Sequence, residues 1–146
     1  HPRNRSKTAD LCAASHASII VFMGQYECHV FICTFGSWCK RDGDTEAILK
    51  RFKQAVVGAG LQNRVRINKA GCLNQCGHGP MIVFYPQDRW YSRVTEEDVA
   101  DLFEAEIVQS KPLLRLLYDA PPGANKDLSR YPPELVAAER AKEGNG

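Results

Sequence analysis

Four cysteines of this chain fall into two pairs whose spacing suggests chemistry. Five residues separate Cys33 from Cys39, and three separate Cys72 from Cys76. Thiolates repel one another unless a metal neutralises them, so four converging thiols without disulfides are most simply metal ligands. Six cysteines in 146 residues are too few for a disulfide scaffold. Cysteines grouped in this way favour metal or redox chemistry instead.

The spacing also separates the kinds of site that such thiols form. A thioredoxin-type thiol–disulfide centre needs Cys-x-x-Cys, and neither pair has it. Paired ligands of a closed zinc site usually lie about two to four residues apart, so the loop between Cys33 and Cys39 is too long. An iron–sulfur cluster with two irons tolerates looser spacing, because each pair can span its own iron. A zinc-stapled interaction module stays the alternative.

Composition and charge exclude several other classes of protein. The chain has 19 Lys and Arg against 17 Asp and Glu, a net charge of +2, which argues against a general nucleic-acid or membrane-surface binder. No apolar run approaches the roughly 20 residues of a membrane-spanning helix. The run from Ala17 to Met23 is too short for a secretory signal. We therefore expect a cytoplasmic protein that binds neither nucleic acid nor membrane.

The chain divides into one predicted domain and two outer segments. Residues 1–22 lack a clear helical or strand period and are predicted to be a disordered leader or extension. Residues 23–118 carry the cysteine pairs and enough apolar positions for one core. Residues 119–146 are polar and punctuated by prolines, which predicts a flexible tail with a short helix from Glu134 to Lys142. We expect both outer segments to be dispensable for folding.

The periodicity of the central region predicts alternating strands and helices. Short apolar runs bounded by turn residues indicate strands, and apolar positions three or four residues apart indicate helices. In chain order, the predicted elements are a strand at residues 29–33, a helix from Asp44 or Thr45 to Gly58, a strand at 64–68, a hairpin of strands at 81–85 and 89–92, and a helix beginning at Thr95.

This order of elements places the two cysteine pairs near one another. A strand–helix–strand crossover makes the first two strands parallel, so their carboxyl ends lie at the same edge of the sheet. Cys33 ends the first strand, and Cys72 follows the second by a few residues. We therefore expect the two cysteine loops to meet at this edge, where ligand sites of open α/β sheets form.

The sequence around the cysteines resembles the thioredoxin-like [2Fe-2S] ferredoxins. The resemblance covers about residues 26–118, and it rests on the segments His29–Cys39 and Val65–Pro86 followed by Trp90-Tyr91. A motif specific to that family lies at residues 71–80, where the sequence reads Gly-Cys-Leu-x-x-Cys-x-x-Gly-Pro before an apolar strand and Tyr-Pro. The first loop reads Cys-Thr-x-Gly-x-x-Cys, which is shorter than in better-known members and indicates a short-loop branch.

The resemblance implies a fold, a cofactor and a function. The fold is a thioredoxin-like α/β fold of order βαβββα, with a mixed four-stranded sheet and two main helices. The implied [2Fe-2S] cluster is held by Cys33, Cys39, Cys72 and Cys76. The protein would be a one-electron carrier without enzymatic activity, serving redox partner proteins, in a family where homodimers are frequent. A cluster-bearing subunit or accessory domain of a larger oxidoreductase is a further alternative.

Each residue beside the cysteines can be assigned either a functional or a purely structural role. Trp38 either shields the site from water or anchors its loop, and His78 either tunes the site or is an ordinary loop histidine. Lys40 and Arg41 either steer an acidic partner or are simply solvated. Because these two cations follow Cys39, and the second pair leads toward a buried hairpin, we expect the first pair to hold the iron that is reduced.

Overall fold

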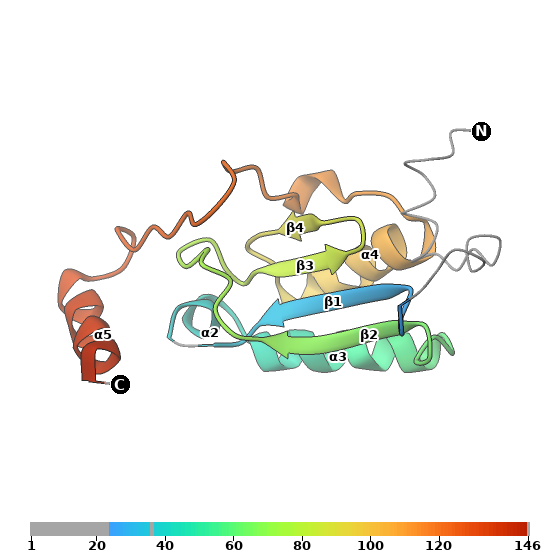
Figure 1. Ribbon diagram of the computed structural model, residues 1–146, viewed down its shortest axis with the longest axis horizontal. Coiled ribbons are helices and arrows are strands. Elements are labelled where there is room, and N and C mark those ends of the chain that lie inside the picture. Colours follow the sequence, from blue (N-terminus) through green and yellow to red (C-terminus); the bar gives the residue numbers. More distant parts are fainter. Residues whose placement is uncertain (1–23, 36, 146) are drawn as a thin grey trace.

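A four-stranded mixed sheet forms the centre of the protein (Figure 1). The structure, a computed structural model, describes residues 24–35 and 37–145, so the predicted leader at 1–22 lies outside the described residues. The strands follow the spatial order β2-β1-β3-β4, with β1 parallel to β2 and the other neighbours antiparallel. The strands are β1 (Cys28–Cys33), β2 (Val65–Ala70), β3 (Ile82–Tyr85) and β4 (Arg89–Tyr91).

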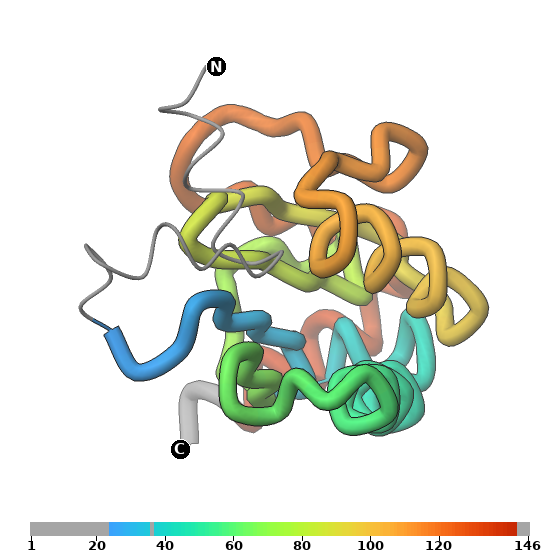
Figure 2. The backbone as a smooth tube through the Cα atoms, turned by 90° about the vertical axis from the view of Figure 1, so that its right-hand side faces the viewer, coloured from blue at the N-terminus to red at the C-terminus, as the bar shows by residue number. Residues whose placement is uncertain are grey.

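Two helical segments pack side by side on one face of this sheet (Figure 2). The helix α3 (Thr45–Gly58) begins where the Asp44 side chain accepts a hydrogen bond from the backbone N–H of Ala47 at 3.0 Å. The second segment runs from the 3₁₀ turn η2 (Glu96–Asp98) through α4 (Val99–Leu102) into the π-helical η3 (Phe103–Val108). The predicted βαβββα order is confirmed. In addition, the last helix changes from α-helical to π-helical geometry after Leu102.

The core lies between the sheet and these helices. On β1, Cys28, Val30 and Ile32 point into the core and are buried, as the alternation of a strand requires. The helix α3 contributes Phe52, whose ring meets that of Phe84 on β3 edge to face at 6.0 Å. Such burial favours folding by about 1.5–3 kcal/mol per large apolar side chain. The position of β1, and hence of Cys33 at its end, is therefore fixed by the core.

A buried carboxylate joins the last helix to the β3–β4 hairpin. Glu106 on η3 is fully buried, and Arg89 donates two hydrogen bonds to it at 2.6 and 2.9 Å. Gln87 donates a third at 2.8 Å, and the Tyr91 hydroxyl donates a fourth. A buried charge is tolerated only when it is paired and hydrogen-bonded in this way. The network pins the hairpin that packs beside the cysteine loops.

One helix was not expected from the sequence. A short helix, α2 (Trp38–Asp42), follows β1 and contains Cys39, although no helical pattern predicted it. The 3₁₀ turn η4 (Leu114–Leu116) leads into the C-terminal segment, residues 119–146. This segment was predicted to be a flexible tail with a short helix at Glu134–Lys142, and it ends in the helix α5 (Pro133–Asn145). From the hairpin side it crosses the sheet edge toward which β1 and β2 point, and α5 lies beyond α2 (Figure 1).

Candidate metal centre

The first cysteine pair belongs to the framework of the fold. Cys33 is the last residue of β1, and its backbone N–H donates to the carbonyl of Met81 at 3.1 Å. Cys39 lies in α2, one residue after its start. Both cysteines are only 2% exposed. Elements of the core therefore hold both thiols of this pair.

The second pair lies in the loop that follows β2. Cys76 is 8% exposed, and Cys72 is half-buried, so Cys72 is the most accessible of the four thiols. Their sulfur atoms lie 3.5 Å apart. Asn74, between them, has a φ of 63° and donates its backbone N–H to the Cys72 sulfur at 3.3 Å. The loop thus turns back on itself and brings its two thiols together.

The two pairs meet at the edge of the sheet, as the crossover geometry predicted. The backbone N–H of Leu73, in the second loop, donates to the sulfur of Cys33 in the first. The charges of Cys33 and Cys76 are close enough to influence each other, and so are those of Cys39 and Cys76. All four candidate ligands therefore belong to one site.

The thiols share their protons unequally. The pKa of Cys33 is lowered to about 6, chiefly because Cys39 donates a hydrogen bond to it. The same hydrogen bond, together with burial, raises the pKa of Cys39. Burial raises the pKa of Cys76 to about 12. Metals bind thiolates, so binding here releases protons that burial otherwise retains, and the metal supplies the positive charge that the buried site lacks.

Backbone N–H groups point at the sulfur atoms of both pairs. Phe35 and Leu73 donate to Cys33, Met81 donates to Cys39, and Asn74 donates to Cys72. Such donors stabilise negative charge on sulfur, which is the usual way in which a protein tunes an iron–sulfur centre. These donors belong to residues other than Gly71, Gly77 and Gly79, the three glycines that surround the second pair.

The glycines Gly77 and Gly79 allow neighbouring residues to approach the backbone of the second loop closely. A Cβ on Gly79 would lie 2.6 Å from the Cys39 sulfur, and a Cβ on Gly77 would lie 1.9 Å from the carbonyl oxygen of Asp127. Gly77 also has a φ of 99°, which favours glycine. In contrast, a Cβ on Gly71 would meet no atom within 4 Å. Two of the three glycines therefore allow contacts that a side chain would block.

The donor set fits a two-iron centre. Within the described ranges, no three His, Cys, Asp or Glu side chains are grouped so that they could hold one metal ion. The thiols come instead as two pairs, one from each loop, joined by the N–H of Leu73. Two pairs with N–H donors on their sulfurs suit a cluster in which each pair binds its own iron.

The C-terminal segment covers the second pair. The backbone N–H of Asp127 donates to the carbonyl of Cys76 at 2.8 Å, and that of Asn125 donates to the carbonyl of Asn74 at 3.1 Å. The Arg130 guanidinium donates to the carbonyl of Gly77 at 3.0 Å. The segment therefore follows the loop that carries Cys72 and Cys76, and it satisfies that loop's backbone carbonyls.

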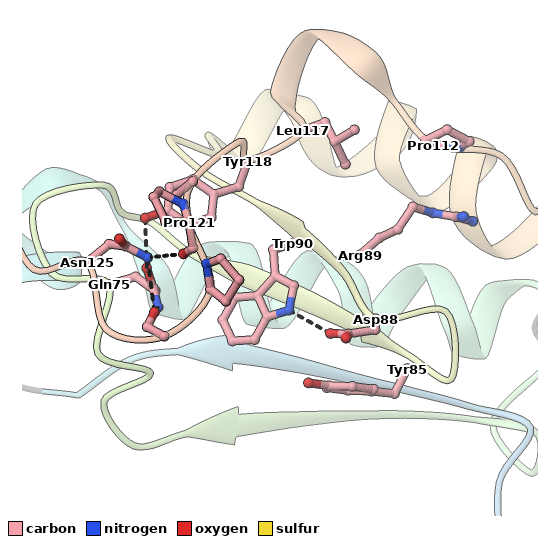
Figure 3. Close-up of a pocket in the computed structure, with 13 residues that line it drawn as sticks. Gln75, Tyr85, Asp88, Arg89, Trp90, Pro112, Leu117, Tyr118, Pro121 and Asn125 are labelled. Carbon is pink, nitrogen blue, oxygen red and sulfur yellow. Dashed lines mark hydrogen bonds between the residues drawn. The ribbon is translucent and has the colours of Figure 1, made fainter.

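Side chains of the second loop hold the same segment. Gln75, buried between the two cysteines, accepts a hydrogen bond from the Tyr118 hydroxyl at 2.7 Å and donates one to the carbonyl of Gly123 at 2.9 Å. Asn125 lies beside Gln75, at one end of a hollow of about 590 Å³ that Trp90 also lines (Figure 3). His78 is half-buried, with its Nε2 2.8 Å from the Asn125 carbonyl oxygen. It contacts the C-terminal segment, which neither sequence-based reading included.

An aromatic contact lies against the second pair. Trp38 (5% exposed) and Tyr131 (7%) meet with ring centroids 4.4 Å apart, and they form a buried cluster with Cys76. The Tyr131 hydroxyl donates to Asp42 on α2 at 2.5 Å. Trp38 therefore packs against both Cys76 and a residue of the C-terminal segment. Sequence reasoning missed Tyr131.

The burial of the two pairs is the reverse of what we expected. The first pair was predicted to lie nearer solvent, but Cys33 and Cys39 are buried by the strand, α2 and the segment leading into β3. Cys72 is the accessible thiol, because its loop leaves the sheet after β2. The burial argument for placing the reducible iron on the first pair is therefore wrong.

Among the described residues, no helix is long and apolar enough to span a membrane.

Comparisons with known proteins place the chain among ferredoxins. No protein-family model matches it. It is 30% identical over 97 residues to "Ferredoxin, 2Fe-2S" of Clostridium pasteurianum, in an alignment that covers 60% of this chain and 92% of that protein. It is 31% identical over 105 residues to "Ferredoxin, 2Fe-2S" of Aquifex aeolicus, covering 65% of this chain and 94% of the relative.

A solved structure agrees with these sequence matches. The thioredoxin-like [2Fe-2S] ferredoxin of Aquifex aeolicus superposes with a TM-score of 0.62 at 27% identity, over 70% of this chain and all of that one. The fold is therefore thioredoxin-like, as the sequence predicted. The relatives are covered almost completely by a part of this chain, so this chain has residues without a counterpart in them. From its sequence and its fold, the chain belongs to the thioredoxin-like [2Fe-2S] ferredoxin family.

Proposed function

We propose that this protein is a one-electron carrier that holds a [2Fe-2S] cluster through Cys33, Cys39, Cys72 and Cys76. The observation that carries the proposal is the meeting of two thiol pairs at one sheet edge, with backbone N–H groups directed at their sulfurs. When bound, the cluster supplies a centre that accepts and releases one electron. Two relatives are 2Fe-2S ferredoxins, which supports this reading.

The residues of this chain would bind and insulate the cofactor. The four thiolates neutralise metal charge, and the N–H groups of Leu73 and Met81 stabilise the negative charge that remains on the sulfurs of the first pair. Trp38 and Tyr131 exclude water from Cys76. Because β1 and the hydrogen-bonded second loop hold the ligands in place, little rearrangement would accompany a change of charge. We propose that redox partner proteins supply and receive the electron.

Replacement of single cysteines tests the proposal. We expect Cys39→Ala and Cys72→Ala to lose most of the bound iron and sulfide, the visible absorption, and the electron paramagnetic resonance signal of the dithionite-reduced protein. Cys28→Ala is the matched control, because Cys28 lies on β1 in the main core and outside the two pairs. It should keep its spectrum. An unchanged spectrum in Cys72→Ala would refute the assignment of the ligands.

The same preparation separates the proposal from the zinc alternative. Zinc bound to thiolates is colourless in the visible range and silent in electron paramagnetic resonance, whereas a [2Fe-2S] cluster is neither. We expect two irons and two inorganic sulfides per chain. One equivalent of zinc without sulfide would instead indicate a stapled interaction module.

A further inference from the structure

A hollow of about 500 Å³ opens beside the second cysteine pair. Cys72 and Cys76 line it together with Trp38 and Phe35. Phe35 is 63% exposed, so it presents an apolar surface at the opening of the hollow.

The other walls of the hollow come from the C-terminal segment, and most of their charges are positive. Lys126, Arg140 and Lys142 line it, and Glu139 is its single carboxylate. Lys142 donates to Glu139 at 3.2 Å, which leaves two cations in excess. This local excess of two positive charges equals the net charge of the whole chain, which is +2. A concave surface lined by one sign of charge attracts groups of the opposite sign.

The hollow borders the most exposed of the four candidate ligands. Cys33 and Cys39 are 2% exposed, and Cys72, which lines the hollow, is the most exposed of the four. A partner that docks in the hollow comes nearest to a candidate ligand without unfolding any element.

We propose that this hollow is where the protein exchanges its electron, and that the partner is a one-electron redox protein whose docking surface carries carboxylates around an apolar contact. The inference rests on the proposed function. The partner loses one electron, the site gains it, and the reverse exchange returns it, with no bond made or broken. Carboxylates would face Lys126 and Arg140, while the apolar group would meet Phe35.

The test compares two variants that change the net charge equally. Lys126→Glu/Arg140→Glu reverses charge in the hollow, and Lys50→Glu/Lys53→Glu reverses it on the exposed side of α3. In stopped-flow oxidation of the dithionite-reduced protein, the hollow variant should react with anionic ferricyanide roughly tenfold more slowly, and with cationic hexaamminecobalt(III) faster. The α3 variant should change much less. Equal changes in the two variants would overturn the proposal.

A second measurement does not depend on electron transfer. With the oxidised protein, the redox-inert anion hexacyanochromate(III) should broaden the backbone NMR signals of residues 139–142, and this broadening should vanish in the hollow variant only. Broadening centred elsewhere would also overturn the proposal. If the wild-type protein binds iron but shows no reversible one-electron step, the proposed function fails, whereas failure of the docking site leaves that step intact and abolishes only the difference between the variants.

Discussion

Cys33 and Cys39 are placed by a strand, a short helix and the core beneath them, whereas Cys72 and Cys76 lie in a loop whose outer side is covered by the C-terminal segment. The first pair is uniformly buried, and the second is graded from buried Cys76 to half-buried Cys72. One half of the site thus depends on the sheet. The other half depends on a segment that the sequence pattern marked as dispensable, which means that the two halves can be disturbed separately.

The largest effect should come from a methyl group placed against the first pair. In Gly79→Ala, the new Cβ would lie 2.6 Å from the Cys39 sulfur and 3.2 Å from its Cα. Overpacking of this kind costs about 1–3 kcal/mol of unfolding free energy, and here it also displaces a candidate ligand. We expect the iron content of the purified protein, measured per chain, to fall strongly.

The matched control is Gly71→Ala in the same loop region, where a Cβ meets no atom within 4 Å. This variant should keep its iron content and its visible spectrum. If Gly79→Ala also retained full iron content, the close approach to Cys39 would have no role in holding the cofactor.

A methyl group at Gly77 should disturb the second half of the site without touching the first. Its Cβ would lie 1.9 Å from the Asp127 carbonyl oxygen, and the residue has a φ of 99°, so the C-terminal segment must move away. We expect the protein to fold and to bind iron, but to lose the iron to a chelator roughly tenfold faster. A tenfold change in this rate corresponds to lowering the free-energy barrier to iron loss by about 1.4 kcal/mol. The rate can be followed by the decay of visible absorption.

Substitutions of Tyr131 test the same dependence of the second pair on the C-terminal segment, and their expected effect is smaller. Tyr131→Ala removes the ring that packs on Trp38, and Tyr131→Phe removes only the hydroxyl that donates to Asp42. We expect Tyr131→Ala to accelerate loss of iron several-fold, and Tyr131→Phe to cost about 1 kcal/mol or less of stability with little effect on that rate. Urea unfolding and chelator kinetics measure the two quantities.

Combining Tyr131→Ala with Gly77→Ala provides a check on the mechanism. Both changes release the same segment, so their effects on the rate of iron loss should be less than additive. Full additivity would mean that the two residues protect the site independently of each other.

The central fold was predictable because local signals and burial agree there. The helix α3 begins beside Asp44, as the capping pattern indicated, and β1 alternates buried and half-buried residues as an apolar strand against a helix layer should. The crossover rule then brought both cysteine loops to one edge, before any side chain was placed. The helix α2 was missed because it has only five residues, too few to show a period.

The C-terminal cover was missed because its contacts are distant in sequence. Its prolines and polar residues indicated a tail, and the loop that it covers has no pattern of its own. One signal was available. Apolar residues recur there at intervals of mostly three to four residues, which is the spacing of a face that packs on something. They are Leu128, Tyr131, Leu135 and Val136, all in or against the cluster around Cys76.

The smallest effect, a spectroscopic one, concerns which pair holds the iron that is reduced. Lys40 and Arg41 suggested the first pair, but both thiols there are buried, and burial disfavours added negative charge. The first pair receives more backbone N–H groups, from Phe35, Leu73 and Met81, which acts in the opposite direction. These donors are present in both oxidation states, however. Only the increase in their hydrogen-bond strength on reduction therefore influences which iron is reduced.

Solvation decides between these effects, because its contribution grows steeply with charge, and Cys72 is the thiol that solvent reaches. Lys126 adds a positive charge that favours the thiolate of Cys76. We therefore expect the ferrous character of the reduced protein to lie on the Cys72–Cys76 pair. Paramagnetic NMR of the cysteine β-protons, assigned with Cys33→Ser and Cys72→Ser variants, measures this directly. Ferrous character on the Cys33–Cys39 pair would show that Lys40, Arg41 and the N–H donors outweigh solvent access, and that burial is not what distinguishes the two halves of the site.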